Sequence, residues 1–276
     1  MANKPMLIPQ RRMVEAEPFY ENKTDKALRA LEDTRDPSYE GTYVPDIVDA
    51  RIGVFHDSKD NLDVARNDFM FQNWFKTLSA RITGRTRQGK EVVAYVHIPS
   101  DLSRSQYITA LIEQGKLING ASPISQAEFQ RLLDLEDGKL VYVIDHKDLM
   151  ESPSGVISVK DARSHPQTKP FLAGKLEYLD VREKVYGKNI GVWHSDDLHD
   201  EPFGRLLVVG NDCDYGGLSG DGLDISAHVL GVRSNTGEAS ERKIFPSQDK
   251  LAEIINDSVP TLLQPQVRER VSALYR

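Results

Sequence analysis

The amino-acid sequence predicts an α/β or α+β protein with a mixed, partly parallel β-sheet flanked by helices and an antiparallel strand region in its C-terminal half. Strand-like and helix-like segments alternate in the first half of the chain, which is typical of a sheet with helices packed against it. Three strand-like segments then follow one another with no helix between them. Hydrophobic residues make up 39% of the 276 residues and charged residues 28%, so the chain can bury a sizeable core.

The first 46 residues are expected to form an N-terminal arm with a short helix, and residues 47–276 a globular body. The body could be one domain or two closely packed lobes divided near residues 150–190. A helix is predicted from Thr24, because Ala27, Leu28 and Leu31 share one of its faces. An extended arm could pack on the body or on a neighbouring subunit, so a protein partner or a homo-oligomer is one expectation.

Within the body, residues 47–56 are predicted as a strand. The next segment is predicted as a core-facing helix, since its apolar residues follow the helical spacing i, i+3, i+4, i+7 and i+11: Phe71, Trp74, Phe75, Leu78 and Ile82. Residues 92–98 and 140–144 are predicted as strands. A helix is expected around Ile108, and another after Ser125, where the Ser125 to Glu128 spacing matches a capping box.

The middle of the chain, residues 158–186, is predicted to be helical but broken, because Pro166 and Pro170 each lack an amide donor. Gly187 suits the left-handed position that ends a helix. Three strands are then predicted at residues 190–194, 205–209 and 225–232. Two final helices are expected from Ser247 and Pro265.

Charge argues against a nucleic-acid partner. The chain carries 35 Lys and Arg against 42 Asp and Glu, a net charge of −7, which repels a phosphate backbone unless basic groups cluster on one face. The densest basic run is interpreted as a solvated helix end and loop: Arg81, Arg85, Arg87 and Lys90. No nucleic-acid contact is therefore expected.

A cytoplasmic location is expected from cysteine usage and hydropathy. The single cysteine, Cys213, excludes an internal disulfide and a multi-cysteine zinc site, which fits a reducing compartment. The first residues lack the uninterrupted apolar core of a signal peptide. No apolar run approaches the roughly 20 residues that a membrane helix needs. We therefore expect a soluble protein with no membrane contact.

The most unusual stretch is GNDCDYGGLSGDGLD, residues 210–224, which we call the acidic segment. Its aspartates could converge on a hard cation such as Ca²⁺ or Mg²⁺, because the intervening glycines let the backbone fold back and such cations prefer oxygen ligands. The candidate metal ligands are Asp212, Asp214, Asp221 and Asp224. The alternative is a pair of tight turns in water, since turns select Asp, Asn and Gly.

The acidic segment is not an EF-hand. Asp212 and Asp214 fit the first two acidic positions of the EF-hand loop and Gly217 fits its glycine, but Gly216 and Leu223 stand where two further ligands belong. The flanking segments also look like strands rather than helices.

A second cluster, His194 to Asp200, contains two imidazoles and three carboxylates in seven residues. His194 and His199 are weak candidates for a general base, because a neutral imidazole titrates near pH 7. A solvated loop is the alternative. If strands 190–194 and 205–209 pair as a hairpin, His194 and the acidic segment fall at opposite ends of the second strand, which argues against one shared site.

Signatures of nucleophilic and nucleotide chemistry are missing. The sequence contains no G-x-S-x-G, no G-x-G-x-x-G after a strand and no H-E-x-x-H, so neither a nucleotide nor a flavin cofactor is indicated. The leading hypothesis is a binding or interaction protein whose acidic segment contacts a divalent cation or a polar ligand. Two alternatives stay open: a metal-assisted hydrolase or transferase acting on a phosphorylated or glycosidic small molecule, and a structural or assembly component.

Overall fold

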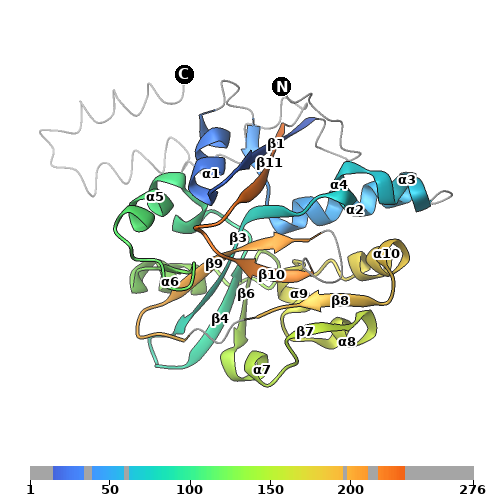
Figure 1. The fold of residues 1–276 in the computed structure, drawn as a ribbon. Helices are drawn as coiled ribbons and strands as arrows, with labels where there is room; N and C mark the ends of the chain where they lie inside the picture. Colours follow the sequence, from blue (N-terminus) through green and yellow to red (C-terminus); the bar gives the residue numbers. More distant parts are fainter. Residues whose placement is uncertain (1–14, 34–38, 59–61, 195–197, 211–216, 234–276) are drawn as a thin grey trace, which may run out of the picture. The chain divides into compact units, whose positions relative to one another are not determined.

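Strands β3 and β9 lie at the centre of the larger of two sheets. The computed structural model describes residues 15–33, 39–58, 62–194, 198–210 and 217–233, which belong to one compact unit. The strand order is β6-β4-β3-β9-β10-β8-β7, with β5 beside β9 (Figure 1). The strands are β3 (Phe75–Arg85), β4 (Glu91–Val96), β5 (Ser122–Pro123), β6 (Val141–Asp145), β7 (Gly155–Ser158), β8 (Asn189–Val192), β9 (Phe203–Val209) and β10 (Leu218–Asp221).

The larger sheet is mixed, as the sequence predicts. Strands β8 and β10 run parallel, whereas β3, β4, β6 and β9 pair antiparallel with their neighbours. The alternation of strands and helices in the first half therefore produces antiparallel pairs there, and the parallel pair lies in the C-terminal part. The smaller sheet is antiparallel in the order β1-β11-β2. Its strands are β1 (Glu15–Glu21), β2 (Tyr39–Gly41) and β11 (Ala227–Arg233).

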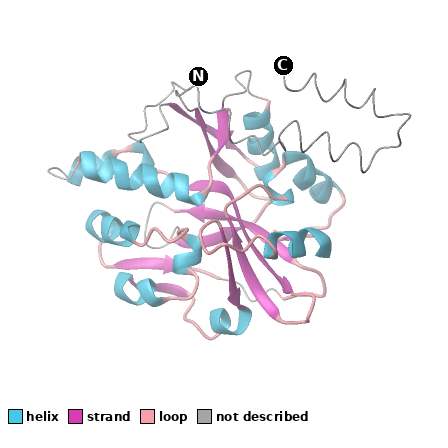
Figure 2. Ribbon diagram, turned by 180° about the vertical axis from the view of Figure 1, so that it is seen from behind, coloured by secondary structure: helices cyan, strands magenta, loops and turns pink. Residues whose placement is uncertain are grey.

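Helices cover both faces of the larger sheet (Figure 2), and alternate residues of β4 point to different cores. Val93 and Tyr95 join a cluster with α2, α8, α9 and α10, whereas Val92 and Ala94 join one with α1, α5 and α6. The helices are α1 (Thr24–Glu32), α2 (Val44–Asp57), α3 (Leu62–Asn67), α4 (Phe69–Gln72), the 3₁₀ turn η1 (Asp101–Ser103), α5 (Ser105–Glu113), α6 (Gln126–Leu133), α7 (His146–Met150), α8 (Val159–Ser164), α9 (Thr168–Phe171) and α10 (Glu177–Tyr186).

Two predicted elements are wrong. Residues 47–56 form helix α2 rather than a strand, because Pro45 lies in its first turn and the Asp46 carboxylate accepts from the Tyr43 amide at 2.8 Å. These start signals prevail over the β-branched composition of the segment. Residues 75–85 form strand β3 rather than a helix. A central strand that is covered on both faces shows no alternation of apolar and polar residues. The helical spacing of apolar residues across α4 and β3 is therefore accidental.

Other predictions are confirmed. Helix α1 begins at Thr24, and Ser125 caps α6 by accepting from the Glu128 amide at 3.2 Å. The broken middle becomes three short helices, α8 to α10, and Gly187 ends α10 with φ of 101°. Strands β8, β9 and β11 match the three predicted C-terminal strands within a few residues. The helices predicted from Ser247 and Pro265 lie outside the described residues.

The basic run is not a helix end. Arg81 is buried in β3, and the other three residues pair with carboxylates around the β3–β4 hairpin. The pairs are Arg85 with Glu91 at 3.2 Å, Arg87 with Asp134 at 3.0 Å and Lys90 with Asp145 at 3.2 Å. Among the described helices, none is long and apolar enough to cross a bilayer.

Candidate functional site

The ends of β8 and β9 meet at Leu218, the first residue of β10. Leu218 is in register with Val192 on one side and with Val209 on the other. The Trp193 amide donates to the Leu218 carbonyl oxygen at 2.9 Å. Because β10 lies between β8 and β9, these two strands do not form the hairpin considered above. Trp193 and Gly210, the first residue of the acidic segment, therefore directly follow the two residues that flank Leu218.

The Gln167 side chain bonds the main chain of this junction. Its side chain is buried, and its Nε2 donates to the Leu218 carbonyl oxygen at 2.9 Å and to the Trp193 carbonyl oxygen at 3.4 Å. Its Oε1 accepts from the Tyr95 hydroxyl at 3.1 Å. Burial raises the pKa of Tyr95 to about 12, so the phenol keeps its proton and stays a donor. A single amide side chain thus fixes the backbone of two strands.

His194 lies beside this junction and contacts main-chain groups. Its Nε2 lies 3.3 Å from the Ser152 carbonyl oxygen, and His165 Nε2 lies 3.1 Å from the Pro153 carbonyl oxygen. The two ring centroids are 5.8 Å apart. Burial lowers the pKa of His165. This pair of imidazoles holds the segment 152–154 against the end of β8, next to Trp193, whose side chain is 39% exposed.

His199 lies at the other end of β9. Its ring packs on Phe203, the first residue of β9, with centroids 4.4 Å apart, and its carbonyl oxygen accepts from Arg85 at 3.5 Å. Strand β9 has seven residues, so roughly 20 Å of strand separates this end from the Leu218 junction. The structure therefore does not bring His194 and His199 together.

Arg51 holds the start of the acidic segment. Its guanidinium is fully buried between the rings of Phe71 and Tyr178. Its Nη1 donates to the Gly210 carbonyl oxygen and to the Tyr178 hydroxyl, both at 2.5 Å. The remaining donors bond main-chain oxygens: Met70 at 2.8 Å, Asn73 at 2.7 Å and Val209 at 3.4 Å. Helix α2 thus anchors the exit of β9.

Lys76 holds the end of the acidic segment. Its side chain is buried in β3, and Nζ donates to the Gly222 carbonyl oxygen at 2.6 Å and to the Thr24 hydroxyl at 2.9 Å. The Leu223 amide donates to the Gly120 carbonyl oxygen at 2.8 Å, and the Leu223 side chain is buried. The turn after β10 is therefore packed against the body.

The four candidate aspartates are not equally placed. Asp212 and Asp214 lie outside the described residues. Asp221 belongs to strand β10, opposite Leu206, rather than to a loop. Asp224 is exposed at the turn. Among the described residues, no three His, Cys, Asp or Glu side chains are grouped as a metal site, so the cation prediction for Asp212 and Asp214 stays a prediction.

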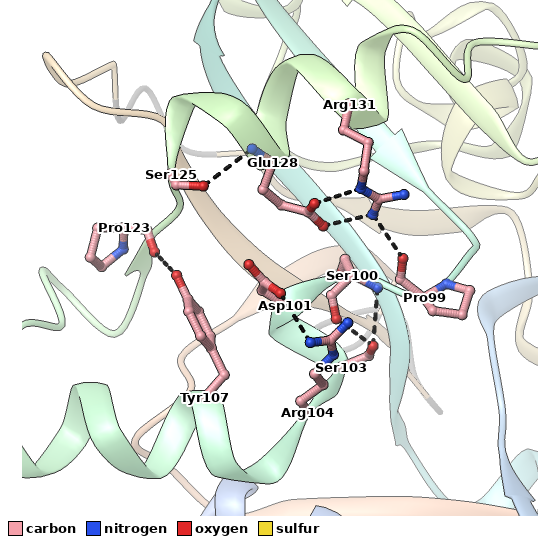
Figure 3. A network of polar contacts seen from close by, with 10 residues as sticks. All are labelled: Pro99, Ser100, Asp101, Ser103, Arg104, Tyr107, Pro123, Ser125, Glu128 and Arg131. Atoms are coloured by element: carbon pink, nitrogen blue, oxygen red, sulfur yellow. Dashed lines mark hydrogen bonds and ion pairs between the residues drawn. The ribbon is translucent and has the colours of Figure 1, made fainter. Parts of the chain in front are cut away.

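A separate hollow of about 480 Å³ lies between α5, β5 and α6. Figure 3 shows the polar network beside it. The Tyr107 hydroxyl donates to the Pro123 carbonyl oxygen at 2.8 Å, and burial, followed by the Asp101 charge, raises the pKa of Tyr107. Glu128 pairs with Arg131 at 2.6 Å. The Tyr107 hydroxyl, Glu128 and Arg131 already have partners within the fold, so the hollow is a weaker candidate than the Leu218 junction.

Comparison with known proteins identifies the fold family. No family model matches the chain, and no curated protein matches it by sequence. One solved structure, from a study of the accommodation of massive sequence variation in Nanoarchaeota by the C-type lectin fold, is similar to it with 40% sequence identity and a TM-score of 0.69. The match covers 82% of this chain and 100% of that one. The chain therefore belongs to the C-type lectin fold family.

Proposed function

We propose that this protein binds a polar, positively charged ligand with a surface around the Leu218 junction to which Trp193 and the acidic segment contribute. The C-type lectin fold is a binding fold, and the convergence of β8, β9 and β10 at Leu218 supplies the support for such a surface. Exposed Trp193 offers an indole face, and the aspartates of the acidic segment offer negative charge. Indole faces and carboxylates both attract cationic groups.

This proposal depends on main-chain contacts of three buried side chains, Arg51, Gln167 and Lys76, which we call the anchors. Arg51, Gln167 and Lys76 donate to the carbonyl oxygens of Gly210, Leu218 and Gly222. Such bonds do not depend on which side chains the acidic segment bears. The related Nanoarchaeota structure concerns a C-type lectin fold that accommodates massive sequence variation. We infer that this chain uses the same fold as a scaffold on which a recognition surface can change its side chains.

A divalent cation held by Asp212 and Asp214 is the alternative to a cationic ligand there, since Ca²⁺ binding is common in the C-type lectin fold. The enzyme alternative has less support, because His194 bonds a main-chain carbonyl oxygen and His199 lies at the opposite end of β9. A general base shared by both histidines is not formed by the described residues.

The test is a selection of peptides from a random library displayed on phage, with the full chain immobilised. We expect enrichment of Lys- and Arg-containing peptides whose affinity falls at least about tenfold for Trp193→Ala and for the double variant Asp212→Asn/Asp214→Asn. Ile118→Ala is the matched control, because Ile118 is exposed and lines the separate hollow. Peptides that bind all variants equally would contradict the proposed surface.

A further inference from the structure

We propose that the ammonium group of Lys76 is the cation that holds the turn formed by residues 222–226, so that this turn needs no divalent metal. This inference rests on the proposed function only in that the turn ends the acidic segment. It assigns to Lys76 a positioning role, because Lys76 acts through the backbone of the turn and not on a ligand.

The oxygens around Lys76 are of the kind that bind hard cations. Carbonyl oxygens of Gly222 and Ser226 lie 2.6 Å and 3.5 Å from Nζ, and the Thr24 hydroxyl lies at 2.9 Å. Carbonyl and hydroxyl oxygens are ordinary ligands of Ca²⁺, and an ammonium group offers three donors. The described oxygens of this turn therefore fit an ammonium group, and a metal would have to displace it.

Thr24 extends the arrangement to a third carbonyl group. Its hydroxyl accepts from Lys76 Nζ and donates to the Ile225 carbonyl oxygen at 3.2 Å. Gly222, Ile225 and Ser226 thus turn their carbonyl oxygens toward one buried positive charge, directly or through one hydroxyl. Because a buried charge is costly unless its donors are satisfied, the turn and Lys76 stabilise each other.

A second cation lies near the same turn. A Cβ atom added at Gly120 would lie 2.8 Å from Asp224 Oδ1 and 3.6 Å from Arg205 Nη1, so the Asp224 carboxylate and the Arg205 guanidinium flank the same backbone position. Together Lys76 and Arg205 bring two positive side chains to the turn. A divalent metal added there would meet like charges.

The experiment measures hydrogen exchange of the Leu223 amide and the melting temperature of the full chain in EDTA, in Ca²⁺ and in Mg²⁺. The wild type is expected to protect Leu223 equally in all three. Lys76→Met is expected to lose most of that protection and about 5 °C or more in melting temperature, because two carbonyl groups lose a charged donor. Lys116→Met, a change at an exposed lysine, is the matched control and should leave both readouts unchanged.

Protection of Leu223 that requires Ca²⁺ in the wild type, or that survives in Lys76→Met, would overturn the inference. If Lys76→Met does not fold, Thr24→Val serves as the milder variant, since it removes only the hydroxyl that joins Lys76 to Ile225. It should weaken Leu223 protection in EDTA and in Ca²⁺ alike, and rescue by Ca²⁺ would sink the inference. This experiment does not measure peptide binding, so a failure of the proposed function and a failure of this inference give different results.

Discussion

Gly217 lies against the backbone of Gly191, where the acidic segment rejoins the sheet. A Cβ atom added at Gly217 would fall 1.6 Å from the Gly191 carbonyl oxygen, and neither backbone can move without breaking the pairing of β10 with β8 at Leu218. Glycine at position 217 is thus required by the close approach of the two backbones. This requirement does not depend on the aspartates of the acidic segment.

Gly217→Ala is therefore expected to lower the free energy of unfolding by about 3 kcal/mol, at the upper end of the usual cost of overpacking. Urea denaturation followed by circular dichroism measures this. Gly220→Ala is the matched control, because the nearest atom to a Cβ there is the Arg205 Cβ at 3.3 Å, so the overlap is far smaller than at Gly217. Equal stability losses for the two variants would contradict the close-approach argument.

Arg51→Met is expected to cost about 3 kcal/mol or more, because the carbonyl groups of Gly210, Met70 and Asn73 lose a charged donor inside the core. Arg51→Lys keeps the charge but lacks the planar fork that bonds several oxygens at once, so it should rescue only part of the loss. Full recovery in the lysine variant would mean that charge alone, without the fork, holds the segment.

Much of the fold could be predicted from local signals. The Ser125 cap, the prolines that break residues 158–186 and the three C-terminal strands each depend on neighbours in sequence. Strand β10 could not, because its residues Leu-Ser-Gly-Asp have the composition of a turn. Only its two partners, β8 and β9, make it a strand.

The two wrong elements contain the residues that hold the acidic segment. Arg51 lies in the stretch predicted as a strand, and Lys76 in the stretch predicted as a helix. Both are fully buried charged side chains, and burial of charge is the opposite of what composition suggests. Their role depends on carbonyl groups 159 and 146 positions away in the chain, so no pattern local to either residue could reveal it.

His97 should make the protein less stable in mild acid. Its Nε2 donates to the Pro170 carbonyl oxygen at 2.8 Å, and Nδ1 lies 2.8 Å from the Ser79 hydroxyl. Burial lowers its pKa to about 4 from 6.5. The unfolded chain therefore binds more protons than the folded chain between these values. The contribution of His97 to the free energy of unfolding is fully present above pH 6.5. It falls by roughly 3 kcal/mol as the pH falls toward 4.

The measurement is the difference between wild type and His97→Gln in urea midpoint across this pH range, because other groups titrate there too. The glutamine variant should show a flatter dependence. Parallel profiles for the two proteins would show that His97 does not carry the acid sensitivity.

The anchors predict that the middle of the acidic segment tolerates replacement. The fourfold variant Asp212→Ala, Cys213→Ala, Asp214→Ala and Tyr215→Ala leaves the donors of Arg51 and Lys76 on the carbonyl groups of Gly210 and Gly222. Its free energy of unfolding should stay within about 1 kcal/mol of wild type, whereas peptide binding should be lost. Arg51→Met, measured beside it, is the control for a broken anchor. A fourfold variant as unstable as Arg51→Met would mean that these side chains, and not the main chain, hold the recognition surface in place.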